Sequence, residues 1–161
     1  MSGVNLRFPK GFSLVELIVT MVVVGILAVT MAPRMFSIQG FDARGFYDQT
    51  MAILHFAQKT AIAQRRTVCV AFTPNSVTLT IAVAAGATAC AGNPLTGPDG
   101  AAPYSVTGNG VTYAATPTDF NFDGRGRPID AAGALVATQI IQVSGNTNTL
   151  TIEAETGYVH P

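Results

Sequence analysis

The residues with the clearest chemical content lie near the N-terminus, where one carboxylate sits inside an apolar run. Residues 14–32 contain a single charged residue, Glu16, close to the start of the run. A charge at the centre of a helix in hydrocarbon costs about 2.5–3.5 kcal/mol, so such a residue is a functional hypothesis by default. The carboxylate must find a cationic partner, be neutralised, or reach the cytoplasmic headgroups a few residues away.

The apolar run itself has the length of a membrane anchor. It holds 19 residues, and about 20 apolar residues span a bilayer core. Arg7 and Lys10 precede it, which predicts a cytoplasmic N-terminus. The sharp change in composition lies between Gly11 and Phe12, so cleavage there would remove a basic leader and keep the anchor. An anchor that is never cleaved is the alternative.

The residues around this break resemble a known signal. Gly-Phe-Ser-Leu-Val-Glu at 11–16 is similar to the type III signal of type IV prepilins and of type II secretion pseudopilins. The resemblance implies that prepilin peptidase cuts between Gly11 and Phe12 and methylates the new N-terminus. Glu16 then matches the family glutamate, and its partner would be the α-amino group of Phe12. Pro33 matches a proline that loosens the helix in many members.

The resemblance also implies a function and a location. The chain would be a structural subunit and not an enzyme: a minor pilin or pseudopilin at the initiation or tip of a type IV pilus or type II secretion pseudopilus. Its partners would be other pilins or pseudopilins, prepilin peptidase and the assembly platform of the bacterial inner membrane. The domain after the anchor would be periplasmic before assembly. The alternative is a binding module that captures DNA or a surface for the fibre.

The remaining chain predicts an α+β fold, with one long N-terminal helix packed on an antiparallel sheet. We expect a cleaved leader at 1–11, a transmembrane and assembly half-helix at 12–35, and an extracytoplasmic domain at 36–161. The helix is predicted to run from about residue 12 to 65, softened between Pro33 and Gly45. Its core face is indicated by apolar residues at spacings of three and four, namely Tyr47, Met51, Leu54, Ala57 and Ala61. Strands are predicted at 67–72, 77–83, 111–115, 120–122, 135–143 and 149–154, with a long surface loop at 84–103.

The two cysteines, Cys69 and Cys90, predict a disulfide, because an exported domain folds in an oxidising compartment. The alternative is two unpaired thiols. We predict no metal site, since His55 and His160 lie far from both cysteines in the sequence.

Residues 122–128, Phe-Asp-Gly-Arg-Gly-Arg-Pro, are the remaining candidate binding motif. Arg125 and Arg127 could contact DNA phosphates, with glycines allowing the backbone to come close. Alternatively, these arginines pair with Asp123 or Asp130 in a structural connection. Without residues 1–11, seven basic residues face nine acidic ones, which is unlike the bulk charge of a nucleic-acid binder.

Two finer resemblances bear on this motif. Residues 57–70 and the helix-then-strand order are similar to GspH/FimT-type pseudopilins, in which a Gly-Arg-Gly-Arg-Pro segment is common in the sheet region. Members that bind DNA carry Gly-Arg-x-Arg near the C-terminus, whereas residues 157–160 read Gly-Tyr-Val-His. A short segment at 32–34 resembles minor pilins of the mannose-sensitive haemagglutinin pilus. We predict a structural role, no cofactor and no catalytic site, since the common nucleophile, zinc and phosphate-loop motifs are missing from the sequence.

Overall fold

A computed structural model describes residues 12–35 and 38–161 of the chain. The leader, including the predicted cleavage residue Gly11, lies outside the described residues. The chain divides into two units, Met1–Ser37 and Ile38–Pro161. The first unit contains helix α1 (Leu14–Met35), and the second begins with helix α2 (Ile38–Gln64).

The structure describes two helical segments within the predicted helix of residues 12–65, and its continuity at residues 36–37 stays a prediction. Pro33 lies within α1, and residues 36–37 between the helices are outside the described part. The expected softening near Gly40 and Gly45 does not interrupt the helix, because α2 runs through both. Each glycine costs a helix about 1 kcal/mol relative to alanine. Burial of the neighbouring Ala43, Phe46 and Tyr47 offsets that cost.

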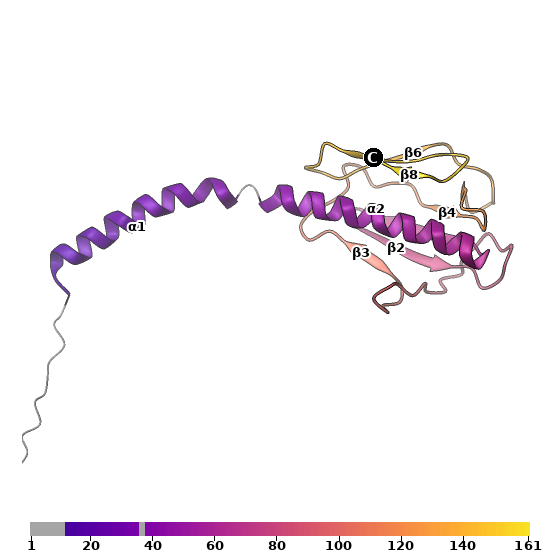
Figure 1. Ribbon diagram of the computed structural model, residues 1–161, viewed down its shortest axis with the longest axis horizontal. Helices are drawn as coiled ribbons and strands as arrows, with labels where there is room; N and C mark the ends of the chain where they lie inside the picture. Colours follow the sequence, from indigo (N-terminus) through magenta and orange to yellow (C-terminus); the bar gives the residue numbers. More distant parts are fainter. Residues whose placement is uncertain (1–11, 36–37) are drawn as a thin grey trace, which may run out of the picture. The chain divides into compact units, whose positions relative to one another are not determined.

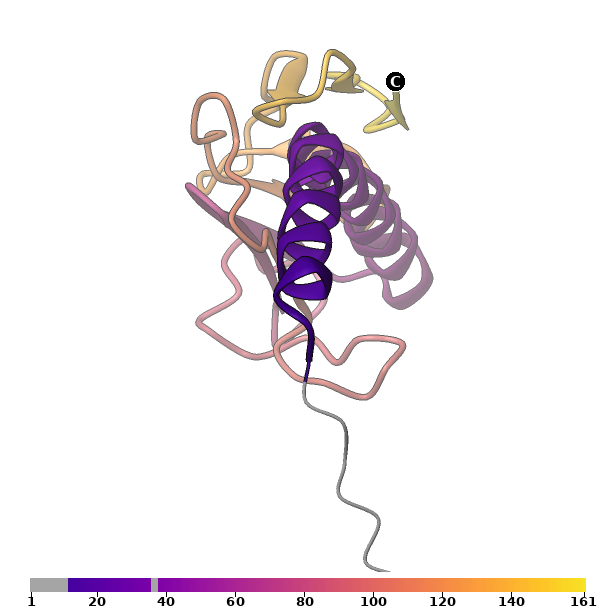
Figure 2. The ribbon, with the colours of Figure 1, turned by 90° about the vertical axis from the view of Figure 1, so that its left-hand side faces the viewer.

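The strands form two antiparallel sheets, and both contact α2. Figure 1 shows β2 and β3 on one side of the helix and β6 and β8 on the other, and Figure 2 shows the same segments from the end. The first sheet has the order β3-β2-β1-β4-β5 and the second β6-β7-β8. The strands are β1 (Val68–Thr73), β2 (Ser76–Ile81), β3 (Ser105–Thr107), β4 (Phe120–Phe122), β5 (Pro128–Ile129), β6 (Gln139–Gln142), β7 (Thr149–Ile152) and β8 (Val159–His160).

The α+β class with a helix packed on an antiparallel sheet is confirmed, but three short strands were not expected from the sequence. β3, β5 and β8 have two or three residues each, too few to show a period. The strand predicted at 111–115 is wrong. Tyr113 forms only an isolated bridge with Val143, because its amide donates to the carbonyl of Pro74 in the turn between β1 and β2.

The core of the second unit lies between α2 and the two sheets. The predicted face of α2 is buried at Tyr47, Leu54, Ala57 and Ala61, and Met51 packs against the core while partly exposed. The buried face is wider than predicted, since Ala43, Phe46, Thr50 and Ile53 are also buried. A wide apolar stripe suits a helix that contacts β1, β3 and β4 of one sheet and β8 of the other.

Tyr113 fixes the middle of α2 through a buried polar contact. Its hydroxyl oxygen lies 3.2 Å from the hydroxyl of Thr50, and its ring packs 4.9 Å from that of Phe46. Burial raises the pKa of Tyr113 to about 12, so the phenol stays neutral and the hydrogen bond persists. At the start of the helix, the hydroxyl of Tyr47 donates to the carbonyl of Thr149 in β7, 3.2 Å away. These contacts join α2 to the segment around Tyr113 and to β7.

Candidate functional site

The N-terminal end of α1 carries the predicted assembly residues. Ser13 precedes the helix, and its carbonyl accepts a hydrogen bond from the amide of Leu17 at 3.1 Å. Ser13 and Glu16 have the spacing of a capping box, in which serine and glutamate satisfy free amides at a helix start. Glu16 lies in the first turn and is exposed. A carboxylate in the first turn also interacts favourably with the positive end of the helix dipole. Glu16 is therefore compatible with a stable helix before it meets a partner.

Apolar side chains are exposed along the described part of α1. Phe12 is 82% exposed, Leu14 74% and Met21 68%. The exposed apolar positions follow one another closely, so they cover every face of the helix; they are Leu14, Val15, Leu17, Ile18, Val19, Met21, Val22, Val23, Val24, Ile26 and Leu27. A helix that is apolar all round is normally buried by other molecules or by lipid.

Among the residues that the structure describes, no helix is both long enough and apolar enough to cross a membrane. The transmembrane helix expected over residues 12–35 stays a prediction.

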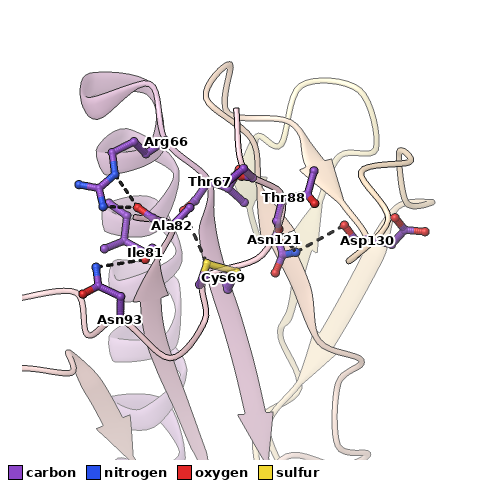
Figure 3. Close-up of a disulfide and its surroundings, with 11 residues drawn as sticks. Arg66, Thr67, Cys69, Ile81, Ala82, Thr88, Asn93, Asn121 and Asp130 are labelled. Carbon is purple, nitrogen blue, oxygen red and sulfur yellow. Dashed lines mark hydrogen bonds between the residues drawn. A yellow bond between two sulfur atoms is a disulfide. The ribbon is translucent and has the colours of Figure 1, made fainter. Parts of the chain in front are cut away.

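Cys69 and Cys90 form a disulfide, with Cα atoms 6.1 Å apart. Cys69 belongs to β1, and Cys90 is buried in the loop that the sequence predicted at 84–103 (Figure 3). The described chain has no unpaired cysteine. The bond therefore ties this loop to the central strand of the larger sheet, beside the end of α2.

Hydrogen bonds close to the disulfide hold the same loop. The guanidinium group of Arg66 donates twice to the carbonyl of Ala82, once from Nε at 2.6 Å and once from Nη2 (Figure 3). The hydroxyl of Thr67 donates to the carbonyl of Ala87 at 2.6 Å. Arg66 is thus committed to the fold and is not available for a ligand.

The two arginines of the candidate DNA motif have different surroundings. Arg127 is bound to Asp123, with Nη2 2.8 Å and Nε 3.0 Å from Oδ2. Oδ1 of Asp123 also accepts the backbone amides of Arg125 and Arg127, each at 2.9 Å. Burial alone would raise the pKa of Asp123, but these hydrogen bonds outweigh it and leave the pKa below its usual value. Arg127 therefore follows the structural alternative, whereas the guanidinium group of Arg125 makes no hydrogen bond or ion pair with a described residue.

The two histidines lie on different elements, His55 on α2 and His160 on β8. Burial and Lys59 lower the pKa of His55 on α2. The ring of His160 lies 3.0 Å from Glu153 and stacks on Tyr158, and the bond to Glu153 raises its pKa. Across residues 12–35 and 38–161, no cluster of three or more histidine, cysteine, aspartate or glutamate side chains could hold a metal ion.

Sequence reasoning missed the roles of two residues at the end of α2. Gln58 donates from Nε2 to the carbonyl of Gly126 at 3.2 Å and to that of Thr156 at 3.0 Å. Arg65 has a φ of 49°, a left-handed conformation that usually requires glycine at a helix end. A non-glycine residue there costs roughly 1–2 kcal/mol. The only sequence signal was negative, since no glycine follows the predicted helix end.

Comparison with known families gives one match to this chain. The family described as "Prokaryotic N-terminal methylation motif" matches residues 7–32. The match includes the break between Gly11 and Phe12 and the carboxylate of Glu16. Comparisons with curated proteins and with solved structures found no match. The matched motif supports a place for this chain in the type IV pilin and pseudopilin class.

Proposed function

We propose that this chain is a minor pilin or pseudopilin, a structural subunit that assembles through its N-terminal helix into a type IV pilus or a type II secretion pseudopilus. The observation that carries the proposal is the methylation motif over residues 7–32. The exposed apolar side chains of α1 support it, because they require cover that other subunits can provide. A place at the initiation complex or tip of the fibre completes the proposal.

Processing would create the group that Glu16 needs. Prepilin peptidase would cleave between Gly11 and Phe12, and the new, methylated amine of Phe12 would carry a positive charge. Two unit charges 4 Å apart attract by about 4 kcal/mol at an effective dielectric constant of 20. Glu16 is exposed on the first turn of α1, so its carboxylate can reach the amine of a neighbouring subunit. This pairing would set the register between subunits.

Before assembly, residues 12–35 would hold the subunit in the bacterial inner membrane with the domain in the periplasm. Support comes from the sequence, in which Arg7 and Lys10 precede a 19-residue apolar run. Membrane fractions extracted with alkaline carbonate test this part. The chain should stay with the membrane pellet, and its release into the supernatant would contradict the anchor.

We do not extend the proposal to DNA capture. Arg127 is occupied by Asp123, and the processed chain would carry more acidic than basic residues. Within residues 122–128, Arg125 is then the arginine left for DNA, and a single phosphate contact gives weak, salt-sensitive affinity.

The test of the main proposal is the N-terminal residue of the mature protein. Intact mass and N-terminal sequencing of the membrane-extracted chain should show a methylated Phe12. Gly11→Val should keep the leader, because a β-branched side chain crowds the scissile peptide. Gly25→Ala is the matched control, since a Cβ at that position meets nothing within 4 Å, and it should be processed normally. A mature chain that starts at any other residue would contradict the proposal.

A further inference from the structure

A polar groove lies at the end of α2. Its volume is about 400 Å³, enough for a small ligand. The side chains that matter are three arginines and one aspartate that line it together, Arg65, Arg125, Arg127 and Asp123. Thr88 and Gly86 add part of the wall from the loop that the disulfide holds.

Close backbone packing brings the arginines together from distant parts of the sequence. A Cβ on Gly124 would lie 3.0 Å from the carbonyl carbon of Arg65, so only glycine allows this approach without a shift. Arg65 itself keeps a left-handed φ that an arginine rarely adopts. Glycine would adopt this conformation without strain, so an arginine here indicates that the guanidinium group of Arg65 has a function.

The charges of the groove are only partly compensated. Asp123 binds Arg127, as described above. The guanidinium groups of Arg65 and Arg125 make no hydrogen bond or ion pair with any residue of 12–35 or 38–161. Three arginines and one carboxylate leave a formal charge of +2 among the lining residues.

We propose that this groove binds a phosphomonoester dianion carried by a small molecule. A guanidinium group presents paired N–H donors that match phosphate oxygens. A phosphomonoester carries a charge of about −1.5 to −2 at pH 7, which balances the excess of the groove. Arg65 and Arg125 would contact the phosphate, Arg127 would stay on Asp123, and the exposed hydroxyl of Thr88 would add a donor.

The charge balance favours a small ligand over a nucleic acid. A long polyanion meets the whole surface, where acidic residues outnumber basic ones without residues 1–11. A single dianion meets only the groove. The site lies on the globular unit and uses no residue of α1, so it stands or fails independently of fibre assembly.

The test is a titration of the full chain, purified in detergent and labelled with ¹⁵N. Glycerol 3-phosphate is added at constant ionic strength while the arginine Nε–H signals are recorded, with sodium chloride as the reference titration. We expect saturable shifts at Arg65 and Arg125 and an unchanged signal for Arg44, which is exposed on α2 outside the groove. Shifts no larger than those with chloride would overturn the proposal.

Variants and a second ligand sharpen the result. Arg65→Gln and Arg125→Gln should each weaken binding about tenfold, as expected for loss of a charge-assisted hydrogen bond, while Arg44→Gln should not change it. Retained near-ultraviolet circular dichroism and an intact disulfide would show that the variants fold. A single-stranded oligothymidylate carries only phosphodiesters and should bind more weakly per phosphate. Tighter binding of the oligonucleotide, or equal weakening by Arg44→Gln, would overturn a specific monoester site.

Discussion

Helices α1 and α2 differ in what covers their apolar side chains. α1 exposes Leu14, Met21 and its neighbours, whereas α2 buries Ile53 and Leu54 completely between two sheets. Full burial of such a side chain contributes roughly 1.5–3 kcal/mol. α2 obtains this free energy within its own chain, whereas in the proposed function α1 would obtain it from lipid or other subunits. Stability and assembly would then depend on different helices.

The largest expected effect concerns assembly and comes from Glu16→Leu. This change should leave membrane association intact, because it removes a costly charge. Incorporation into fibres should fall at least about tenfold, because the Coulomb attraction between Glu16 and the amine of Phe12 is lost. Co-purification with other pilins or pseudopilins measures incorporation. Thr20→Val is the matched control, since the Thr20 hydroxyl bonds only to its own helix at Leu17. Normal incorporation of Glu16→Leu would break the link between α1 and charge pairing.

A pair of leucine substitutions tests the comparison in terms of stability. Leu54→Ala in α2 should lower the free energy of unfolding by about 2–5 kcal/mol through loss of burial and a cavity. Leu17→Ala in α1, where the side chain is 55% exposed, should change it by less than about 0.5 kcal/mol. Urea denaturation of the full chain in detergent, with unfolding of the globular unit followed by near-ultraviolet circular dichroism, measures both. Equal effects would mean that α1 contributes to the core.

Removal of the disulfide is the next largest effect. Cys69→Ser with Cys90→Ser opens a loop with a sequence separation of 21, which should cost about 3 kcal/mol in the chain-entropy model. The same denaturation experiment without reductant measures the loss. Dithiothreitol should destabilise the wild type to a similar extent and leave the double variant unchanged; a response of the variant to reductant would contradict this explanation.

The smallest effect is a pH-dependent one at Asp123. Its pKa in the folded state lies below the ordinary value of 3.8, so the ionised form stabilises the fold above pH 3.8, and this contribution is lost as the pH falls through the folded-state pKa. Asp123→Asn should cost about 1 kcal/mol at pH 7, since the ion pair with Arg127 is partly exposed.

Denaturation curves at pH 7 and pH 3 measure this effect. The difference between wild type and Asp123→Asn should shrink at the lower pH. Asp130→Asn is the control, because Asp130 accepts backbone amides in a similar turn without an arginine partner. A difference that stays constant with pH would exclude the proposed ionisation.

The parts of the fold that sequence reasoning found are those with a regular period. The face of α2 follows from apolar spacings of three and four, and β1, β2 and the β6–β7 hairpin follow from alternation next to turn residues. β3 and β5 exist because longer strands offer free edges to pair with, which depends on folding of the whole chain. The ion pair between Arg127 and Asp123 was one of the two interpretations of the motif, because the two residues are only four positions apart. Arg65 could not be connected to Arg125, because sixty residues separate them.

The central position of α2 also has a mechanical consequence. Its buried side chains are spread from Ala43 to Ala61, over most of a helix that is about 40 Å long. A force along the helix axis must therefore shear contacts with both sheets at the same time, and cannot peel them away one after another. Gln58, which bonds to a loop of each sheet, carries part of that load near the far end. We therefore expect the globular unit to resist extension best along the axis of α2.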